Sequence, residues 1–184
     1  MATKLNPLRD VSQHDIIPFF SLAENSGDVG QFVTIQGSGF KSSDRLATQD
    51  LYTVANTVNW RWSVPHKVRL STSGEGKGEI LGILYTNVRE TNYLGVPMIY
   101  DKTRSAEQNS VPSGQAVNVA VRGYFLVSGV ATGAGNTIQP MSGAQANDSV
   151  NGDWKLVGRN DANSVGSFLG ASDNNGYALF FLNL

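Results

Sequence analysis

The stretch over residues 116–127 limits the possible folds more than any other part of the sequence. Val117, Val119 and Val121 stand at alternate positions, and Gly123 then interrupts the alternation. Alternate side chains share one face of a β-strand, whereas an amphipathic helix needs apolar residues three and four positions apart. After Gly123 the apolar residues are consecutive. The pattern therefore predicts a strand that is half-buried at first and then apolar on both faces.

Similar short runs recur along the chain and are separated by Gly, Asn and Ser. Inside one of these runs, Gly82 indicates a bulge or a close approach of another backbone. The Asp-Asn-Asn-Gly sequence at 173–176 predicts a hairpin turn, because Asn and Gly tolerate positive φ. The Gly-Glu-Gly-Lys-Gly sequence at 74–78 also predicts a hairpin turn. It is not a phosphate loop, because Gly78 replaces the required Ser or Thr and a strand follows. Further strands are predicted over residues 32–35, 52–58, 67–71, 79–85 and 177–182.

Helical periodicity is scarce, and only residues 43–55 are compatible with one short helix. The sequence therefore predicts an all-β fold with at most one short helix. We expect residues 1–20 to form an N-terminal arm and residues 21–184 to form a single β-rich domain. Within that domain, residues 129–153 are rich in Gly, Ala, Asn and Ser and predict a long loop or arm.

Charge and composition argue against several classes of partner. The chain has 14 Lys and Arg residues against 15 Asp and Glu residues, so it lacks the basic excess of a nucleic-acid binder or a polybasic membrane binder. It has no cysteine, which excludes disulfides, thiolate metal sites and thiol catalysis. No apolar run is long enough to span a membrane, and the first residues lack the apolar region of a signal peptide. We expect synthesis in the cytoplasm.

Motifs for catalysis or metal binding are missing from the sequence. Its two histidines, His14 and His66, do not stand in any metal-ligand spacing. No Gly-x-Ser-x-Gly motif supports a serine nucleophile. We therefore expect no enzymatic activity, no cofactor and no metal, although a hydrolase whose acid and base meet only in space stays open.

Trp60 and Trp62 form the one aromatic cluster of note. On a strand they share a face, with Arg61 on the opposite one. Two buried tryptophans would fill a core or a subunit interface, which is the interpretation we favour. Two exposed tryptophans would stack on sugar rings or, less in keeping with the charge, on bases.

Three stretches of the sequence together resemble the capsid decoration (head cement) proteins of tailed bacteriophages. The resemblance lies in residues 19–22 with 29–35, residues 79–84 with 111–123, and residues 165–170 with 174–182, in the same order as in that family. Gln115 stands where the family often has Glu, and residues 41–64 and 129–153 are additional. The resemblance implies a small β-barrel or β-tulip-like module, often a homotrimer, that sits on the outside of an icosahedral shell and reinforces it.

The expected function is therefore that of a structural virion protein whose partners are the major capsid protein and further copies of itself. The candidates for the capsid or subunit interface lie at the end of the N-terminal segment, which alternatively is a disordered tail followed by the first strand. These candidates are Ile16, Ile17, Pro18, Phe19 and Phe20. The alternative function is a carbohydrate- or receptor-binding head of a fibre or spike, which would use Trp60 and Trp62.

Overall fold

The computed structural model describes residues 4–7, 15–37, 67–72, 75, 77–91, 94–95, 110–112, 114–128, 130, 138–146, 152–158 and 161–184. This described part consists of β-strands and their connections and contains no α-helix. The expectation of an all-β fold is confirmed. The short helix expected over residues 43–55 lies outside the described residues.

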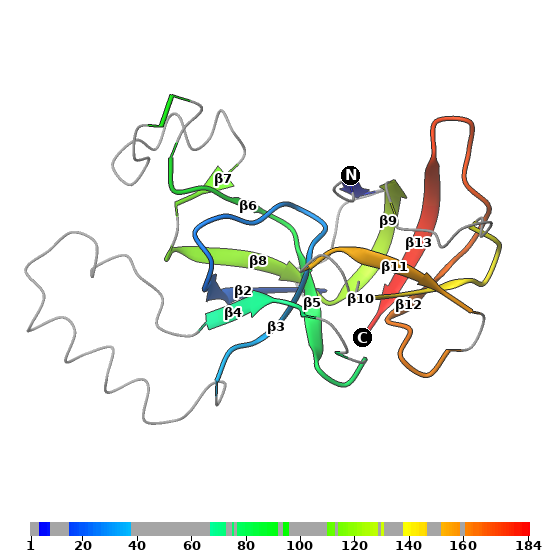
Figure 1. The fold of residues 1–184 in the computed structure, drawn as a ribbon, viewed down its shortest axis with the longest axis horizontal. Helices are drawn as coiled ribbons and strands as arrows, with labels where there is room; N and C mark the ends of the chain where they lie inside the picture. Colours follow the sequence, from blue (N-terminus) through cyan, green and yellow to red (C-terminus); the bar gives the residue numbers. More distant parts are fainter. Residues whose placement is uncertain are drawn as a thin grey trace, which may run out of the picture.

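Five strands close into a small barrel (Figure 1). Its strand order is β2-β4-β3-β5-β8, and only the β2–β4 pair is parallel. A closed barrel satisfies main-chain hydrogen bonds without leaving long free edges, which explains how such short strands are stable. The small barrel that the resemblance implied is thus present. Its strands are β2 (Ile16–Leu22), β3 (Phe32–Ile35), β4 (Lys67–Leu70), β5 (Ile80–Leu84) and β8 (Ala116–Ala120).

A six-stranded antiparallel sheet lies beside the barrel (Figure 1). Its order is β1-β9-β13-β12-β10-β11. A short parallel ladder between β6 (Asn87–Val88) and β7 (Ser110–Val111) completes the described strands. The strands of the six-stranded sheet are β1 (Lys4–Pro7), β9 (Arg122–Ser128), β10 (Gly143–Ala146), β11 (Trp154–Val157), β12 (Gly166–Phe168) and β13 (Tyr177–Asn183).

The segment over residues 116–127 passes from the barrel into the six-stranded sheet. Val117 and Val119 of β8 are buried in the barrel, as their alternation predicted. Val121 separates the end of β8 from the start of β9, and Gly123 in β9 has a φ of 147°. L-residues rarely adopt this conformation, so the glycine lets one continuous segment change direction between the two sheets.

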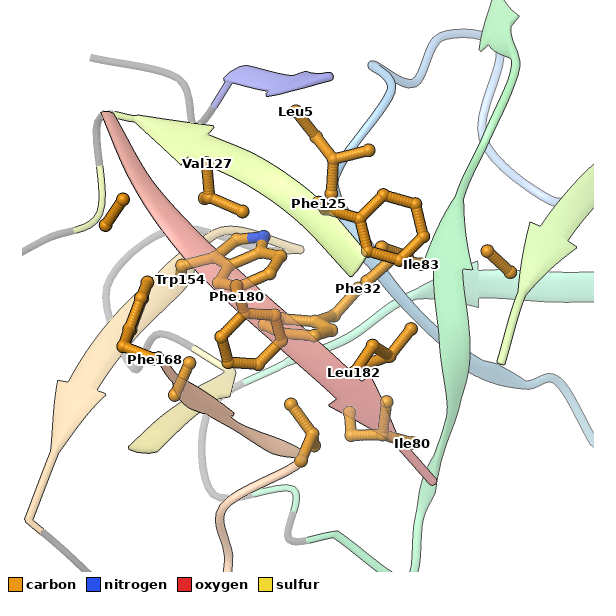
Figure 2. Packing of buried hydrophobic residues seen from close by; sticks show 14 of the residues in the cluster. Leu5, Phe32, Ile80, Ile83, Phe125, Val127, Trp154, Phe168, Phe180 and Leu182 are labelled. Carbon is orange, nitrogen blue, oxygen red and sulfur yellow. The ribbon is translucent and has the colours of Figure 1, made fainter. Parts of the chain in front are cut away.

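Two hydrophobic clusters hold the fold together. The first fills the barrel and includes Phe20, Leu22 and Val68. The second joins barrel strands β3 and β5 to the six-stranded sheet (Figure 2). Because this second cluster contains residues of both sheets, the barrel and the sheet share one core. Its larger side chains are Leu5, Phe32, Ile80, Ile83, Phe125, Val127, Trp154, Phe168, Phe180 and Leu182.

Gly82 in β5 allows a close approach between neighbouring strands, as expected. A Cβ at this position would lie 2.5 Å from the carbonyl oxygen of Ala120 and 2.6 Å from Cγ1 of Val119. The pairing of β5 with β3 also shifts by one residue next to Gly82. Both features named for this glycine, the bulge and the close backbone approach, are therefore present.

Of the two hairpins expected from turn sequences, one is confirmed and one is wrong. Asp173 and Tyr177 close the turn between the antiparallel strands β12 and β13, and Gly176 has a φ of 80°. In contrast, residues 74–78 do not connect hydrogen-bonded neighbours, because β3 lies between β4 and β5. A glycine-rich turn signals a change of direction but does not choose the pairing partner.

The segments expected as arms contain strands of the fold. Within residues 1–20, β1 pairs with β9 and carries the buried Leu5, and β2 is a wall of the barrel. Within residues 129–153, Gly143–Ala146 forms β10, between β12 and β11. Deletion of either segment would therefore remove strands from the sheets.

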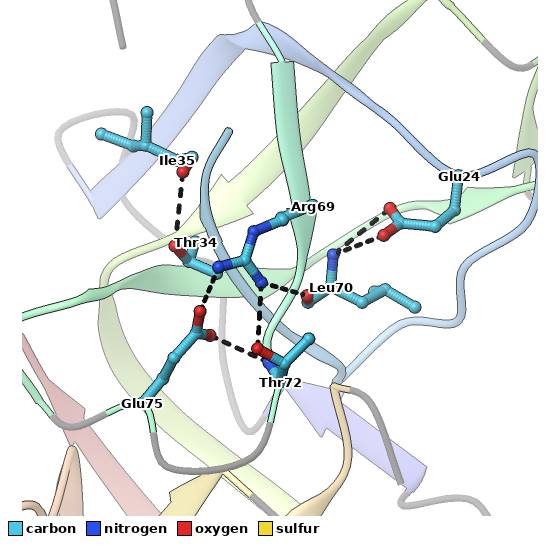
Figure 3. A network of polar contacts seen from close by, with 7 residues as sticks. All are labelled: Glu24, Thr34, Ile35, Arg69, Leu70, Thr72 and Glu75. Atoms are coloured by element: carbon cyan, nitrogen blue, oxygen red, sulfur yellow. Dashed lines mark hydrogen bonds and ion pairs between the residues drawn. The ribbon is translucent and has the colours of Figure 1, made fainter. Parts of the chain in front are cut away.

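A network of polar side chains contacts β4 and the residues that follow it (Figure 3). The Glu24 carboxylate accepts the main-chain N–H of Leu70, with N–O distances of 3.1 and 3.2 Å. Arg69 forms an ion pair with Glu75 and donates to Oγ1 of Thr72 at 3.3 Å. These side chains provide partners for β4, which pairs with β2 through only two residues.

Candidate binding surfaces

The five interface candidates from the sequence lie in strand β2, but they do not form one apolar patch. Phe20 is buried in the barrel core, and Ile17 packs against the same core. Ile16 is half-buried, and Pro18 is exposed. Phe19 belongs to the same strand. Simple alternation would place Ile17 and Phe20 on opposite faces, but the pairing of β2 with β8 shifts register between them, so both contact the core while Pro18 is exposed.

The first part of β2 nevertheless has an edge that no other described strand pairs with. Ile16, Ile17, Phe20 and Ser21 pair with β8 on one side, with a register shift between Ile17 and Phe20. On the other side only Ser21 and Leu22 pair, with β4. Among the strands that the structure describes, none pairs with the second side of residues 16–19. A proline at 18 fits such an edge, because an edge strand tolerates the loss of an N–H donor.

The hydrogen-bond alternation shows which main-chain groups this edge presents. Val121 donates its N–H to the carbonyl of Asp15 at 2.9 Å, which marks these two as a hydrogen-bonded pair. Antiparallel strands alternate bonded and non-bonded pairs, so Ile17 and Val119 form the next bonded pair. Ile16 lies between them, and its N–H and C=O therefore point away from β8.

A second surface is the outer face of the six-stranded sheet, which turns away from the shared core. Tyr124 and Phe181 stack there with ring centroids 4.8 Å apart, and Leu126 lies opposite Leu179. All four side chains are half-buried, whereas their sequence neighbours Phe125, Val127 and Phe180 are fully buried. The sequence pattern predicted apolar residues on both faces here, but it gave no signal for which of them would stack.

Several of the residues considered for chemistry lie outside the described part of the chain. These are Trp60, Trp62, His14 and His66. Within the described residues, no group of three or more His, Asp or Glu side chains is arranged to hold a metal ion. Nor does any helix in that part have the length and apolar character to cross a membrane.

Sequence reasoning missed the tryptophan that matters most for the described structure. Trp154 is fully buried, stacks on Phe32 at 4.6 Å and meets Phe180 edge-on at 4.8 Å. It follows a Gly- and Asn-rich segment, and no alternation precedes it. Only the pairing of β11 with β10 places it in the core.

Comparisons with known proteins add no relative. No protein-family model matches the sequence, and neither a curated protein nor a solved structure matches it.

Proposed function

We propose that this protein is a structural decoration protein that binds the outer surface of a tailed-bacteriophage capsid lattice and stabilises the head. The observation that carries the proposal is that, among the described strands of the closed barrel, none pairs with the second side of β2 at residues 16–19. A strand of a neighbouring protein can extend a sheet at such an edge, where main-chain hydrogen bonds supply affinity. The resemblance of three ordered stretches to phage decoration proteins supports the capsid as the source of that strand.

In this proposal the barrel acts as a rigid support and the edge as the contact. Phe20 and Leu22 of β2 are buried in the barrel core, so the strand is already held in place and little conformational freedom is lost on binding. Ile16 offers one N–H and one C=O to an incoming strand, and Pro18 limits how far that pairing extends. Binding of many copies to a repeating shell needs only a modest affinity at each site.

The remaining parts of the proposal follow from the same resemblance. The major capsid protein is the partner, and the protein is made in the host cytoplasm and ends on the capsid exterior. It associates with itself, as a homotrimer or another homo-oligomer, and it acts by binding without catalysing a reaction. Light scattering of the purified chain, alone and on heads, measures the self-association directly.

The test replaces Ile16 at the edge by lysine. A charged lysine on an edge strand opposes the addition of another strand, whereas Ile16→Val keeps a β-branched apolar residue at the same position. Purified protein is mixed with expanded, DNA-free heads assembled from the major capsid protein encoded in the same genome, and the bound fraction is measured by sedimentation. We expect Ile16→Lys to weaken binding about tenfold or more, because each lost main-chain hydrogen bond removes about 1 kcal/mol.

Two outcomes of this test would contradict the proposal. If the unmodified chain does not sediment with heads, the capsid is not its partner. If Ile16→Lys binds as well as Ile16→Val, the edge of β2 is not the contact. Both variants keep Ile17 and Phe20, which pack in the barrel, and urea denaturation of each variant checks that the fold is intact.

A further inference from the structure

A row of five residues crosses the outer face of the six-stranded sheet in register. Phe181 lies opposite Tyr124 on one side and opposite Ser167 on the other, and Ser167 lies opposite Gly143, which lies opposite Val157. The residues next to them in their strands, among them Phe125, Phe168, Ala144 and Phe180, are buried in the core. By the alternation of strands, the row itself faces outward.

The sizes of the side chains along this row create a hollow. The aromatic rings of Tyr124 and Phe181 are followed by the small side chain of Ser167 and by Gly143, which has no side chain. The larger side chain of Val157 ends the row. A cavity of about 250 Å³ lies at this position and is lined by Phe181, Ser167 and Gly143. Gly143 itself is buried: a Cβ there would collide with Oγ of Ser164 and lie 3.0 Å from Cγ2 of Val157. Ser164 therefore covers this glycine and forms part of the lining of the hollow.

The rim of the hollow carries both hydrogen-bond donors and acceptors. One oxygen of Asp161 accepts the N–H of Asn163 at 2.9 Å, and Oγ of Ser164 donates to the carbonyl of Gly166. The side chains of Lys77, Ser167 and Asn183 line the hollow and make no hydrogen bond within the described part of the chain. Their donors and acceptors can therefore bind a ligand.

We propose that this hollow binds one neutral sugar unit of a glycan. A sugar ring offers many hydroxyl groups, each of which both donates and accepts, and the amide, hydroxyl, ammonium and carboxylate groups of the rim match both roles. Its C–H face is apolar and packs on an aromatic ring such as Phe181, whose orientation is held by the stack with Tyr124. Lys77 and Asp161 carry opposite charges, so the lining has no net charge, in keeping with an uncharged ligand.

The size of the hollow agrees with this ligand. Pockets for drug-sized ligands measure about 300–1,000 Å³. The hollow, at about 250 Å³, is smaller and fits a single ring. The site therefore binds a terminal or branching sugar, and the rest of the glycan stays in solvent. This function goes beyond capsid binding, because it uses the six-stranded sheet and leaves the β2 edge on the barrel free for the lattice.

The experiment is a titration of the full ¹⁵N-labelled chain with glucose, galactose, mannose and N-acetylglucosamine and with their β-linked disaccharides, followed by NMR chemical shifts. We expect at least one of these sugars to shift the amide signals of Ser167, Phe181 and Asn183 in a saturable manner. Ser167→Leu fills the hollow and Asn183→Ala removes a polar group from its rim. Each should weaken binding, Ser167→Leu by about tenfold or more because a filled site excludes the ring.

The matched control is Ser128→Leu, the same substitution on the same sheet face and opposite Tyr177, away from the hollow. It should leave the affinity for the sugar unchanged. The proposal is overturned if none of these sugars shifts the signals of the hollow, or if Ser167→Leu and Asn183→Ala both bind as tightly as Ser128→Leu. Saturable shifts of the same signals by inorganic phosphate, with none by sugars, would identify an anion site and overturn it as well.

Discussion

The indole N–H of Trp154 donates a hydrogen bond to the carbonyl oxygen of Gly30, which lies 124 residues earlier in the chain. Trp154 belongs to the six-stranded sheet, and Gly30 lies two residues before the start of barrel strand β3. The same indole stacks on Phe32 of that strand (Figure 2). One side chain thus connects the sheet to the barrel through both a polar and an aromatic contact.

Replacement of Trp154 by phenylalanine should destabilise the protein substantially. The change leaves the buried carbonyl of Gly30 without its donor and opens a small cavity beside Phe32, so we expect the free energy of unfolding to fall by about 2–4 kcal/mol. Urea denaturation followed by circular dichroism measures the change. Tyr177→Phe is the control, because that half-buried hydroxyl makes no hydrogen bond in the described part of the chain. Equal stability of the two variants would show that the Trp154 contacts do not hold the sheets together.

Gly82→Ala should also destabilise the barrel. The added Cβ would meet the main-chain oxygen of Ala120, and a backbone atom in a closed barrel cannot move aside as a flexible side chain would. Overpacking of this kind costs about 1–3 kcal/mol. The control is Gly78→Ala, at a position where the added methyl group meets open space. If thermal denaturation gives Gly82→Ala a midpoint as high as that of Gly78→Ala, the close approach of β5 and β8 is not tight.

Replacement of Gly176 by alanine tests the backbone conformation of the β12–β13 hairpin without any effect of packing. A Cβ at Gly176 meets nothing within 4 Å, but its φ is 80°. Gly176→Ala should therefore lower the free energy of unfolding by about 1–2 kcal/mol, through backbone strain alone. Gly170→Ala, also in open space but without a positive φ, should leave it nearly unchanged. Chemical denaturation of the two variants side by side measures the difference, and the absence of one would mean that the turn adopts another conformation.

Glu24→Ala should weaken the barrel around β4. It removes the acceptor of the Leu70 N–H and is expected to cost about 1–2 kcal/mol of unfolding free energy. Glu24→Gln keeps a side-chain oxygen in place and should cost less. Hydrogen exchange of the Leu70 amide gives a local readout, and it should speed up more in Glu24→Ala than in Glu24→Gln. Unchanged exchange in Glu24→Ala would show that this amide does not depend on the carboxylate.

The sequence by itself determined the local features of this protein. Alternation over residues 116–127 located β8, the Asp-Asn-Asn-Gly turn located the hairpin before β13, and Gly82 marked a close approach. Each of these depends on side-chain direction or backbone φ within a few residues, and those properties are encoded locally.

Only the tertiary structure decided which strands pair. It placed β3 between β4 and β5, inserted β1 beside β9, and brought Trp154 to Gly30. It also aligned Phe181, Ser167 and Gly143 from three strands, so that small residues lie next to a ring and leave a hollow. Main-chain hydrogen bonds are the same for every residue and do not specify which strand pairs with which. The register across strands is therefore set only when the whole core is packed.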